Sequence, residues 1–177
     1  MKKILVFMLC IGMLITTAAE VFADINHFED GHEIEVFDDY GISLEIPNGW
    51  YVLPLEDMFA LAPDETGDVV YLLSIVEYED RHNLLDDLFL KTATDSGFAG
   101  MTGEDQKGKS KIMTLSNGNN AAVALYYIDV ETKDTYMMAS TFCGSQMIML
   151  GFKSPLDKYE EEYLSDLDYI LSSAEEI

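Results

Sequence analysis

The residues best suited to metal chemistry lie near the start of the chain. His27 and His32 occur in "HFEDGHEIE" together with Glu29, Asp30 and Glu33. Imidazole and carboxylate groups are ligands that zinc accepts. The two histidines are, however, five residues apart in a polar segment, a spacing that does not preorganise a site, and such acidic segments are commonly just solvated. We therefore predict no metal site and no cofactor.

Groups for catalysis do not converge in the sequence. The third histidine, His82, is expected at an exposed position beside the start of a helix. The serine of "CGSQM" joins two expected strands, whereas a serine nucleophile needs a strand-to-helix elbow. Neighbouring carboxylates such as Asp86 and Asp87 point apart on a helix, and neither "PDETGD" nor "FDDYG" reproduces a twelve-residue calcium loop. We assign no catalytic residue.

One group of basic residues stands out in an acidic chain. Lys107, Lys109 and Lys111 alternate in "KGKSK", so on a strand all three ammonium groups share one face. In one interpretation these lysines protect an edge strand against aggregation. In the other they form a positive stripe that binds an acidic partner or an anionic polymer. They are the only binding residues that we assign.

Methionines recur along the expected strands of the second half of the chain. They are Met113, Met137, Met138, Met147 and Met149. Thioether sites for copper exist, but adjacent methionines on a strand face opposite sides, and core filling explains most of them. If several lie on a sheet face without helices, we expect an adaptable groove for an apolar ligand or peptide.

The first residues predict export from the cytoplasm. Lys2 and Lys3 precede an apolar run that ends at Ile15, and small residues lead to Ala23. This pattern is typical of a secretory signal peptide, here cleaved after Ala23, and the run is shorter than a bilayer span. We expect residues 1–23 to be the signal peptide and the mature chain to be secreted or extracytoplasmic, with no membrane attachment.

The net charge of the chain limits the classes of partner that it can bind. The chain carries 10 basic and 33 acidic residues, a formal net charge of −23. Such a surface repels phosphate backbones and anionic lipids, so nucleic acid is a poor partner. Cys143 is the one cysteine after residue 23, so no intramolecular disulfide is predicted, and we expect a buried thiol there.

The first half of the chain predicts strands followed by one helix. Residues 33–37 and 42–46 form a hairpin across "DDYG", after which Pro47, Asn48 and Gly49 turn the chain and deliver Trp50 to one end of the core. Residues 58–62 are a short strand or a helical turn, and 68–78 form a long central strand. A helix starts at an Asn83 cap and ends at Gly97. Its expected buried face is Leu84, Leu85, Leu88 and Phe89. The segment after Gly97 is expected to be flexible.

The second half predicts a meander and a closing helix. Strands are expected within 107–115, 120–130, 135–143 and 146–152, and their short connections, including a two-residue Gly144–Ser145 turn, make neighbours antiparallel. Ser154 is expected to cap a helix that starts at Pro155. Its expected apolar face is Leu156, Tyr159, Tyr163, Leu167, Ile170 and Ala174. The fold class is therefore α+β: an antiparallel sheet of about six to eight strands in a meander, flanked by two main helices.

The hairpin "FDDYGISLEIPNGW", with its Tyr40–Trp50 rhythm, and the order of the expected elements resemble the PsbP-like family. That family comprises the extrinsic subunit of photosystem II and exported bacterial relatives. The resemblance implies a non-enzymatic, exported, single-domain protein that binds a partner protein or a ligand, with metal ions in some members. It transfers no catalytic residue and no photosynthetic role.

The sequence thus predicts a flexible segment at 24–32 and one PsbP-like domain at 33–177. We expect a monomeric binding or accessory domain that recognises an unidentified protein or small ligand. Two alternatives stay open: a metal-sequestering acidic protein, and an enzyme with an unrecognised acidic cleft.

Overall fold

The structure is a computed structural model that describes residues 33–55, 58–78, 86–103, 110–123, 127–129, 131–158 and 162–177. Several predictions concern residues outside these ranges: the signal peptide, the segment 24–32, the three histidines, Asn83, Leu84, Leu85, Tyr159, and the first two lysines of the stripe. They stay predictions.

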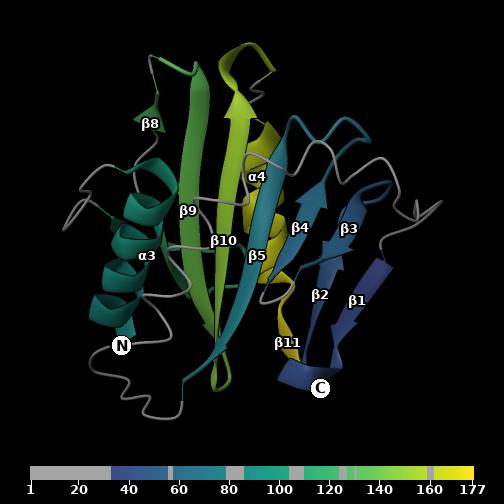
Figure 1. The fold of residues 1–177 in the computed structure, drawn as a ribbon. Helices are drawn as coiled ribbons and strands as arrows, with labels where there is room; N and C mark the ends of the chain where they lie inside the picture. Colours follow the sequence, from purple (N-terminus) through teal and green to yellow (C-terminus); the bar gives the residue numbers. More distant parts are fainter. Residues whose placement is uncertain are drawn as a thin grey trace.

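The larger sheet is antiparallel and follows the predicted meander (Figure 1). Its eight strands are β3 (Tyr51–Pro54), β4 (Phe59–Ala62), β5 (Val70–Glu77), β6 (Lys111–Thr114), β7 (Asn120–Val123), β8 (Tyr127–Ile128), β9 (Asp134–Cys143) and β10 (Gln146–Pro155). They lie in the order β3-β4-β5-β10-β9-β7-β6, with β8 paired to β9. With two α-helices beside it, this sheet confirms the predicted α+β class.

A smaller sheet joins the two ends of the described chain. β1 (Glu33–Phe37) and β2 (Ile42–Ile46) form the expected antiparallel hairpin through the short 3-10 helix η2 (Asp38–Tyr40). β11 (Glu175–Glu176), which the sequence did not predict, pairs with β2 on its other side. The hairpin therefore belongs to a three-stranded sheet of its own.

The two faces of the larger sheet have different covers. α3 (Asp86–Thr102) packs on β6, β7, β9 and β10, and we call this side the α3 face. α4 (Glu162–Ser172) packs on β2, β9 and β10 on the other side, the α4 face, where Phe37, Ile42 and Leu44 also join the core. Figure 1 shows the two helices on opposite sides of the sheet.

The corner at Trp50 carries the chain from the smaller sheet to the larger one. Gly49 has φ 76°, a conformation that favours glycine, and the Trp50 N–H donates to the Pro47 carbonyl at 3.3 Å. The indole is 6% exposed, and its centroid lies 4.8 Å from that of Tyr71. Trp50 therefore closes one end of the core on the α4 face, as predicted.

The predicted end of the first helix and the predicted burial of Leu88 were wrong, whereas Phe89 packs against the core of the α3 face as expected. α3 continues past Gly97 to Thr102, and Leu88 is 64% exposed. The buried residues are Leu90, Ala93, Thr94, Asp95, Gly97, Phe98 and Met101. Gly97 lies against the sheet, where an added Cβ would collide with Met138 Sδ, so its small size serves packing. The terminating glycine is Gly103, whose φ is 73° and whose N–H donates to the Ala99 carbonyl at 2.8 Å.

The predicted start of the last helix was also wrong. Ser154 and Pro155 are the last residues of β10 and pair with Thr135 and Asp134 of β9. β9 has ten residues and pairs with β10 along its whole length, so β10 continues to Pro155. A proline is tolerated at this position because it lies at the end of the strand. The 3-10 helix η3 (Leu156–Lys158) follows, and Leu156 is 42% exposed. The inward face of α4 does hold Leu167 and Ile170, as expected.

The segment after Gly97, expected to be flexible, is helical up to Thr102. Three further local predictions agree with the structure. β5 lies in the middle of the sheet, and residues 59–62 are a strand. The β9–β10 turn has Gly144 at φ 53° and pairs Cys143 with Gln146, so the connection has two residues. Among the described residues, neither helix has the length and apolar character needed to cross a bilayer.

Candidate binding surfaces

The described part of the lysine stripe lies on an outermost strand. β6 pairs with β7 on one side and ends the strand order of the larger sheet. Lys111 and Thr114 are exposed, and Met113 is 42% exposed, whereas Ile112 packs into the core of the α3 face. Lys107 and Lys109 lie outside the described residues. The described end of the stripe therefore presents one ammonium group beside an exposed thioether on an edge strand.

Buried hydrogen bonds fix where β6 begins. The Asp95 carboxylate, 7% exposed on α3, accepts the Ser110 N–H at 2.8 Å. Ser110 Oγ in turn donates to the Lys91 carbonyl at 3.1 Å. Ser110 immediately precedes Lys111, so α3 sets the position at which the lysine leaves the core. Sequence reasoning missed Asp95, because a carboxylate in a helix is ordinarily exposed.

A second buried polar group locks α3 to the sheet. The hydroxyls of Thr94 and Ser140 lie 2.6 Å apart, and both residues are fully buried. Thr94 Oγ1 also lies 3.2 Å from the Ala122 carbonyl oxygen, and Ser140 Oγ lies 3.3 Å from the Leu90 carbonyl oxygen. Each hydroxyl has one proton, so one of the two donates to the other, and the one that accepts donates to its own carbonyl. Because these hydroxyls are paired, their burial fixes the helix over β7 and β9.

The methionines do not form the open groove that the sequence suggested. Met137 lies in the core of the α4 face, while Met138, Met147 and Met149 lie in that of the α3 face. All four are at most 5% exposed. Core filling therefore accounts for them, and Met113 is the exposed member of the group.

The part of the α3 face formed by β3, β4 and β5 has an unusual composition. Ala60 and Ala62 of β4 lie between the larger side chains of two neighbouring strands, in the register Tyr51↔Ala62, Leu53↔Ala60 and Ala60↔Leu72. We call these two alanines, with their flanking residues Tyr51, Leu53, Val70 and Leu72, the Ala60–Ala62 strip. The described helix on this face packs on β6, β7, β9 and β10, and Figure 1 shows it on the side away from β4.

A buried hydroxyl lies beside this strip. Ser74 follows Leu72 by two residues on β5 and therefore points to the same face. The residue is 3% exposed, and within the described part of the chain its Oγ has no hydrogen-bond partner. Its cross-strand neighbour on β10 is Met149. The sequence contained this signal as alternation in "FALA" and "YLLSIV", but without the register the strip could not be assembled.

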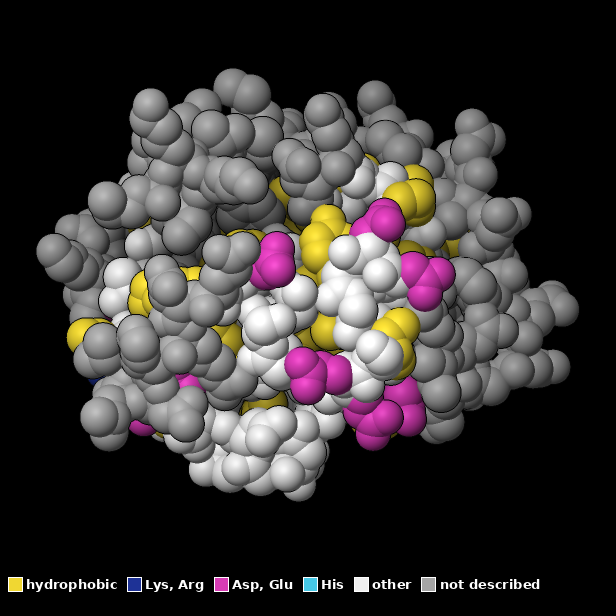
Figure 2. Space-filling view, turned by 90° about the horizontal axis from the view of Figure 1, so that it is seen from below, with side chains coloured by type: hydrophobic (Ala, Val, Ile, Leu, Met, Phe, Trp, Pro, Cys, Tyr) yellow, Lys and Arg dark blue, Asp and Glu magenta, His cyan; other side chains and the backbone are white. Residues whose placement is uncertain are grey.

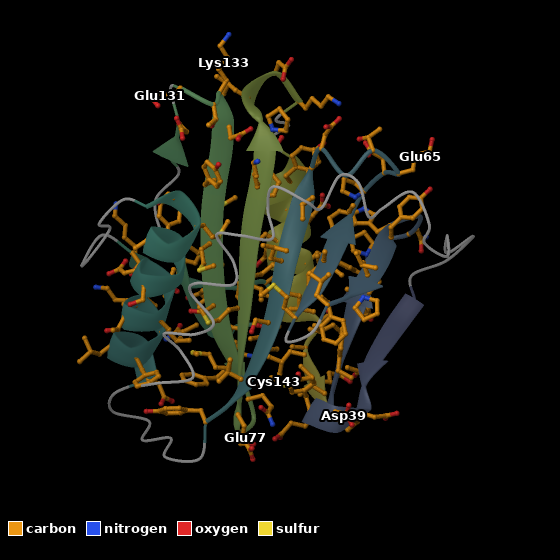
Figure 3. The ribbon with its side chains drawn as sticks, in the orientation of Figure 1. Asp39, Glu65, Glu77, Glu131, Lys133 and Cys143 are labelled. Carbon is orange, nitrogen blue, oxygen red and sulfur yellow. The ribbon has the colours of Figure 1, made fainter. Side chains whose placement is uncertain are left out.

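Acidic groups gather at the end of the molecule shown in Figure 2. Glu77 and Asp39 extend from the lower end in Figure 3, and Asp38, Glu175 and Glu176 are also exposed. Among the described residues, no group of three or more histidine, cysteine or acidic side chains is arranged to hold a metal ion.

The opposite end carries paired charges. Lys153 Nζ lies 3.2 Å from an Asp134 carboxylate oxygen, and Lys158 forms an ion pair with Asp68 that lowers the pKa of that carboxyl. Burial, followed by the charge of Asp134, raises the pKa of Tyr136 to about 12. These contacts join the ends of neighbouring strands and loops and do not surround a reactive group.

Helix α4 is tied to β2 by a tyrosine and a serine. Tyr169 donates its hydroxyl to Glu45, and the Glu45 N–H donates to Ser173 Oγ at 2.8 Å. Burial and this carboxylate together raise the pKa of Tyr169 to about 12. The contact anchors the smaller sheet beneath the helix.

The arrangement of sheet, helices and hairpin defines a PsbP-like fold. Cyanobacterial PsbP (CyanoP) from Synechocystis sp. PCC 6803 matches with a TM-score of 0.55 at 13% identity, over 88% of this chain and 94% of that one. LpqN, described as involved in cell envelope biogenesis of Mycobacterium tuberculosis, matches with a TM-score of 0.50 at 16% identity, over 82% and 90%. These likenesses concern the fold.

A protein from Bacteroides thetaiotaomicron VPI-5482 matches with a TM-score of 0.55 at 12% identity. The match covers 77% of this chain, which spans 45% of the length of that protein. No family model matches the sequence, and no curated protein matches it.

Proposed function

We propose that the protein is an exported accessory domain that recognises a partner protein through β6, the last strand of the described larger sheet, and through the lysine stripe. The observation that carries this proposal is the place of β6 at the end of the strand order, with Lys111 exposed on it. The likeness in fold to LpqN, a protein described as involved in cell envelope biogenesis, supports the extracytoplasmic setting, as does the signal-peptide pattern at residues 1–23.

An edge strand offers unpaired N–H and C=O groups along one side. An extended segment of a partner adds to such an edge through main-chain hydrogen bonds, and its alternate side chains give specificity. Acidic side chains on that segment complement Lys107, Lys109 and Lys111. The remainder of the surface is strongly acidic, so an acidic segment is repelled elsewhere and steered to the stripe.

The experiment measures binding of a labelled synthetic peptide of alternating glutamate and valine by fluorescence anisotropy. The variant Lys107→Glu/Lys109→Glu/Lys111→Glu is expected to lose binding. The control Lys91→Glu/Lys133→Glu/Lys158→Glu changes the net charge by the same amount and should lower the affinity by much less. Rising salt should weaken the wild-type complex.

Equal losses in the two triple variants would mean that net charge alone governs the affinity, and the proposed site would be wrong. Unchanged binding in the stripe variant would also contradict the proposal, and the lysines would then serve to protect the edge. Thermal unfolding of each variant confirms that the fold is retained.

A further inference from the structure

The exposed methionine of β6 lies on the same face of the strand as Lys111. Successive side chains of a strand alternate between faces, so Lys111 and Met113 share one face, while Ile112 packs into the core of the α3 face. We propose that the segment bound at β6 runs antiparallel to the strand and places an aromatic side chain against Met113, two residues before the acidic side chain that pairs with Lys111. This inference rests on the proposed recognition of an acidic segment at β6.

The β6–β7 turn shows which backbone groups of β6 point away from β7. The Leu115 N–H donates to the Asn119 carbonyl at 2.8 Å, and the register of the hairpin places these two residues opposite each other. Hydrogen-bonded pairs alternate with non-bonded pairs along an antiparallel ladder. The N–H and C=O groups of Ile112 and Thr114 therefore point to the side opposite β7, where no described strand lies.

These outward groups can pair with a short extended segment. Ser110, the preceding residue in the same alternation, already donates its N–H to the Asp95 carboxylate. Ile112 and Thr114 each offer one donor and one acceptor, so a segment of about four residues completes the described ladder. Every described strand pair of the larger sheet is antiparallel, and parallel pairing is slightly less stable per residue. We therefore expect an antiparallel segment.

Met113 offers an apolar contact beside the charge of Lys111. The methionine is 42% exposed. Its cross-strand neighbour on β7 is Ala121, whose side chain ends at Cβ and covers little of the thioether. A thioether adapts to neighbouring groups and makes favourable contacts with aromatic rings. An aromatic residue of the partner, placed opposite Met113, would bury apolar surface that the chain itself leaves exposed.

The direction of pairing determines the order of the two side chains in the partner. β6 runs from Lys111 towards Met113, so an antiparallel segment meets Met113 first and Lys111 two residues later. The expected motif is an aromatic residue, any residue, and then an acidic residue. A parallel segment would need the reverse order.

Charge favours an acidic segment of another protein over a second copy of this chain. Two copies with a formal net charge of −23 each repel one another. β6 contains no acidic residue that could pair with Lys111 of another copy. A carboxylate on the bound segment, in contrast, complements the lysine and is repelled by the rest of the surface.

The test measures the Kd of three fluorescently labelled peptides by anisotropy. Peptide A is Thr-Phe-Val-Glu-Val-Glu-Val-Glu, peptide B is the same sequence in reverse order, and peptide C has Thr in place of Phe. All three carry the same charge. We expect A to bind about three- to tenfold more tightly than C, the range of one contact between a thioether and an aromatic ring. A should also bind at least about threefold more tightly than B.

Three variants separate the thioether contact from the main-chain pairing. Met113→Ala should weaken A about three- to tenfold and leave C unchanged. Leu156→Ala is the matched control, because Leu156 is also 42% exposed but lies outside β6, and it should leave each Kd unchanged. Thr114→Pro removes an outward N–H, which an edge strand tolerates, and should weaken A and C alike by at least about fivefold. Thermal unfolding confirms that each variant retains the fold.

The outcomes distinguish this inference from the proposal on which it rests. A folded chain that binds none of the three peptides would contradict both. Equal Kd values for A and C, or equal losses for A and C in Met113→Ala, would overturn the aromatic contact and leave recognition of the acidic segment intact. Equal Kd values for A and B would overturn the antiparallel direction. A dimer in sedimentation velocity that disappears in Thr114→Pro would assign β6 to a second copy and overturn the inference.

Discussion

Two leucines on α3 allow a direct test of how this helix lies on the sheet. Leu88 and Leu90 are two residues apart, so they share the same helix and the same chemistry. Leu88 is 64% exposed, whereas Leu90 is 1% exposed. The perturbation is the same Leu→Ala change at each position, and helix propensity differs little between the two residue types.

The expected magnitudes follow from burial. Truncating a buried leucine removes its transfer free energy and leaves a cavity, at a cost of about 2–5 kcal/mol. We expect about 3 kcal/mol for Leu90→Ala. The Leu90 carbonyl that contacts the Ser140 hydroxyl belongs to the backbone, so the substitution retains this contact. Leu88→Ala should change the free energy of unfolding by at most about 0.5 kcal/mol.

Urea unfolding measures both variants. A constant slope with a lower midpoint indicates a change in stability without a change in the denatured state. For a domain of this size, about 3 kcal/mol corresponds to a decrease in Tm of about 6–12 °C. Equal effects at the two positions would refute the orientation of α3. A larger effect at Leu88 would restore the buried face that the sequence suggested.

Further predictions concern the polar contacts and the corner. Thr94→Val removes a buried hydroxyl that contacts Ser140 Oγ and the Ala122 carbonyl and should cost about 1–3 kcal/mol in urea unfolding. Because the pKa of Tyr169 is raised to about 12, folding keeps its phenol protonated, and this contribution to stability is present below about pH 10 and lost as pH rises towards 12. Tyr169→Phe should reduce that decline, as measured by urea midpoints across this range, and should remove a late-titrating phenol from the ultraviolet titration. Trp50→Ala should cost about 3–5 kcal/mol in the same unfolding assay, and no loss would contradict its place in the core.

The sequence predicted elements whose signals are local. The β1–β2 hairpin, the turn before Trp50 and the Gly144–Ser145 connection each depend on a few adjacent residues with defined backbone conformations. The errors arose where contacts between residues far apart in sequence determine the local structure. Gly97 matches a helix stop by type, but it lies against Met138 of β9, a contact between residues far apart in sequence.

The same distinction applies to the candidate sites. Spacing alone predicted that three lysines share one face, and the structure places Lys111 on an edge strand. The Ala60–Ala62 strip could not be foreseen, because its floor and flanks come from three strands whose register the sequence does not state. β11 was missed for a related reason: two acidic residues have no strand signal, and they pair with β2 only after α4 has returned the chain to that edge.

The position of α3 explains why the lysine stripe and the Ala60–Ala62 strip are separate. Asp95 and Thr94 fix this helix over the β6 end of the sheet through Ser110 and Ser140. A helix held there cannot also lie over β4, which is five strand spacings, or about 24 Å, from β6. Sites at this distance without shared contacts behave additively. A substitution in the strip that retains the fold, such as Ala62→Val, should therefore leave peptide binding at the lysine stripe unchanged, and a loss of peptide binding in that folded variant would contradict this separation.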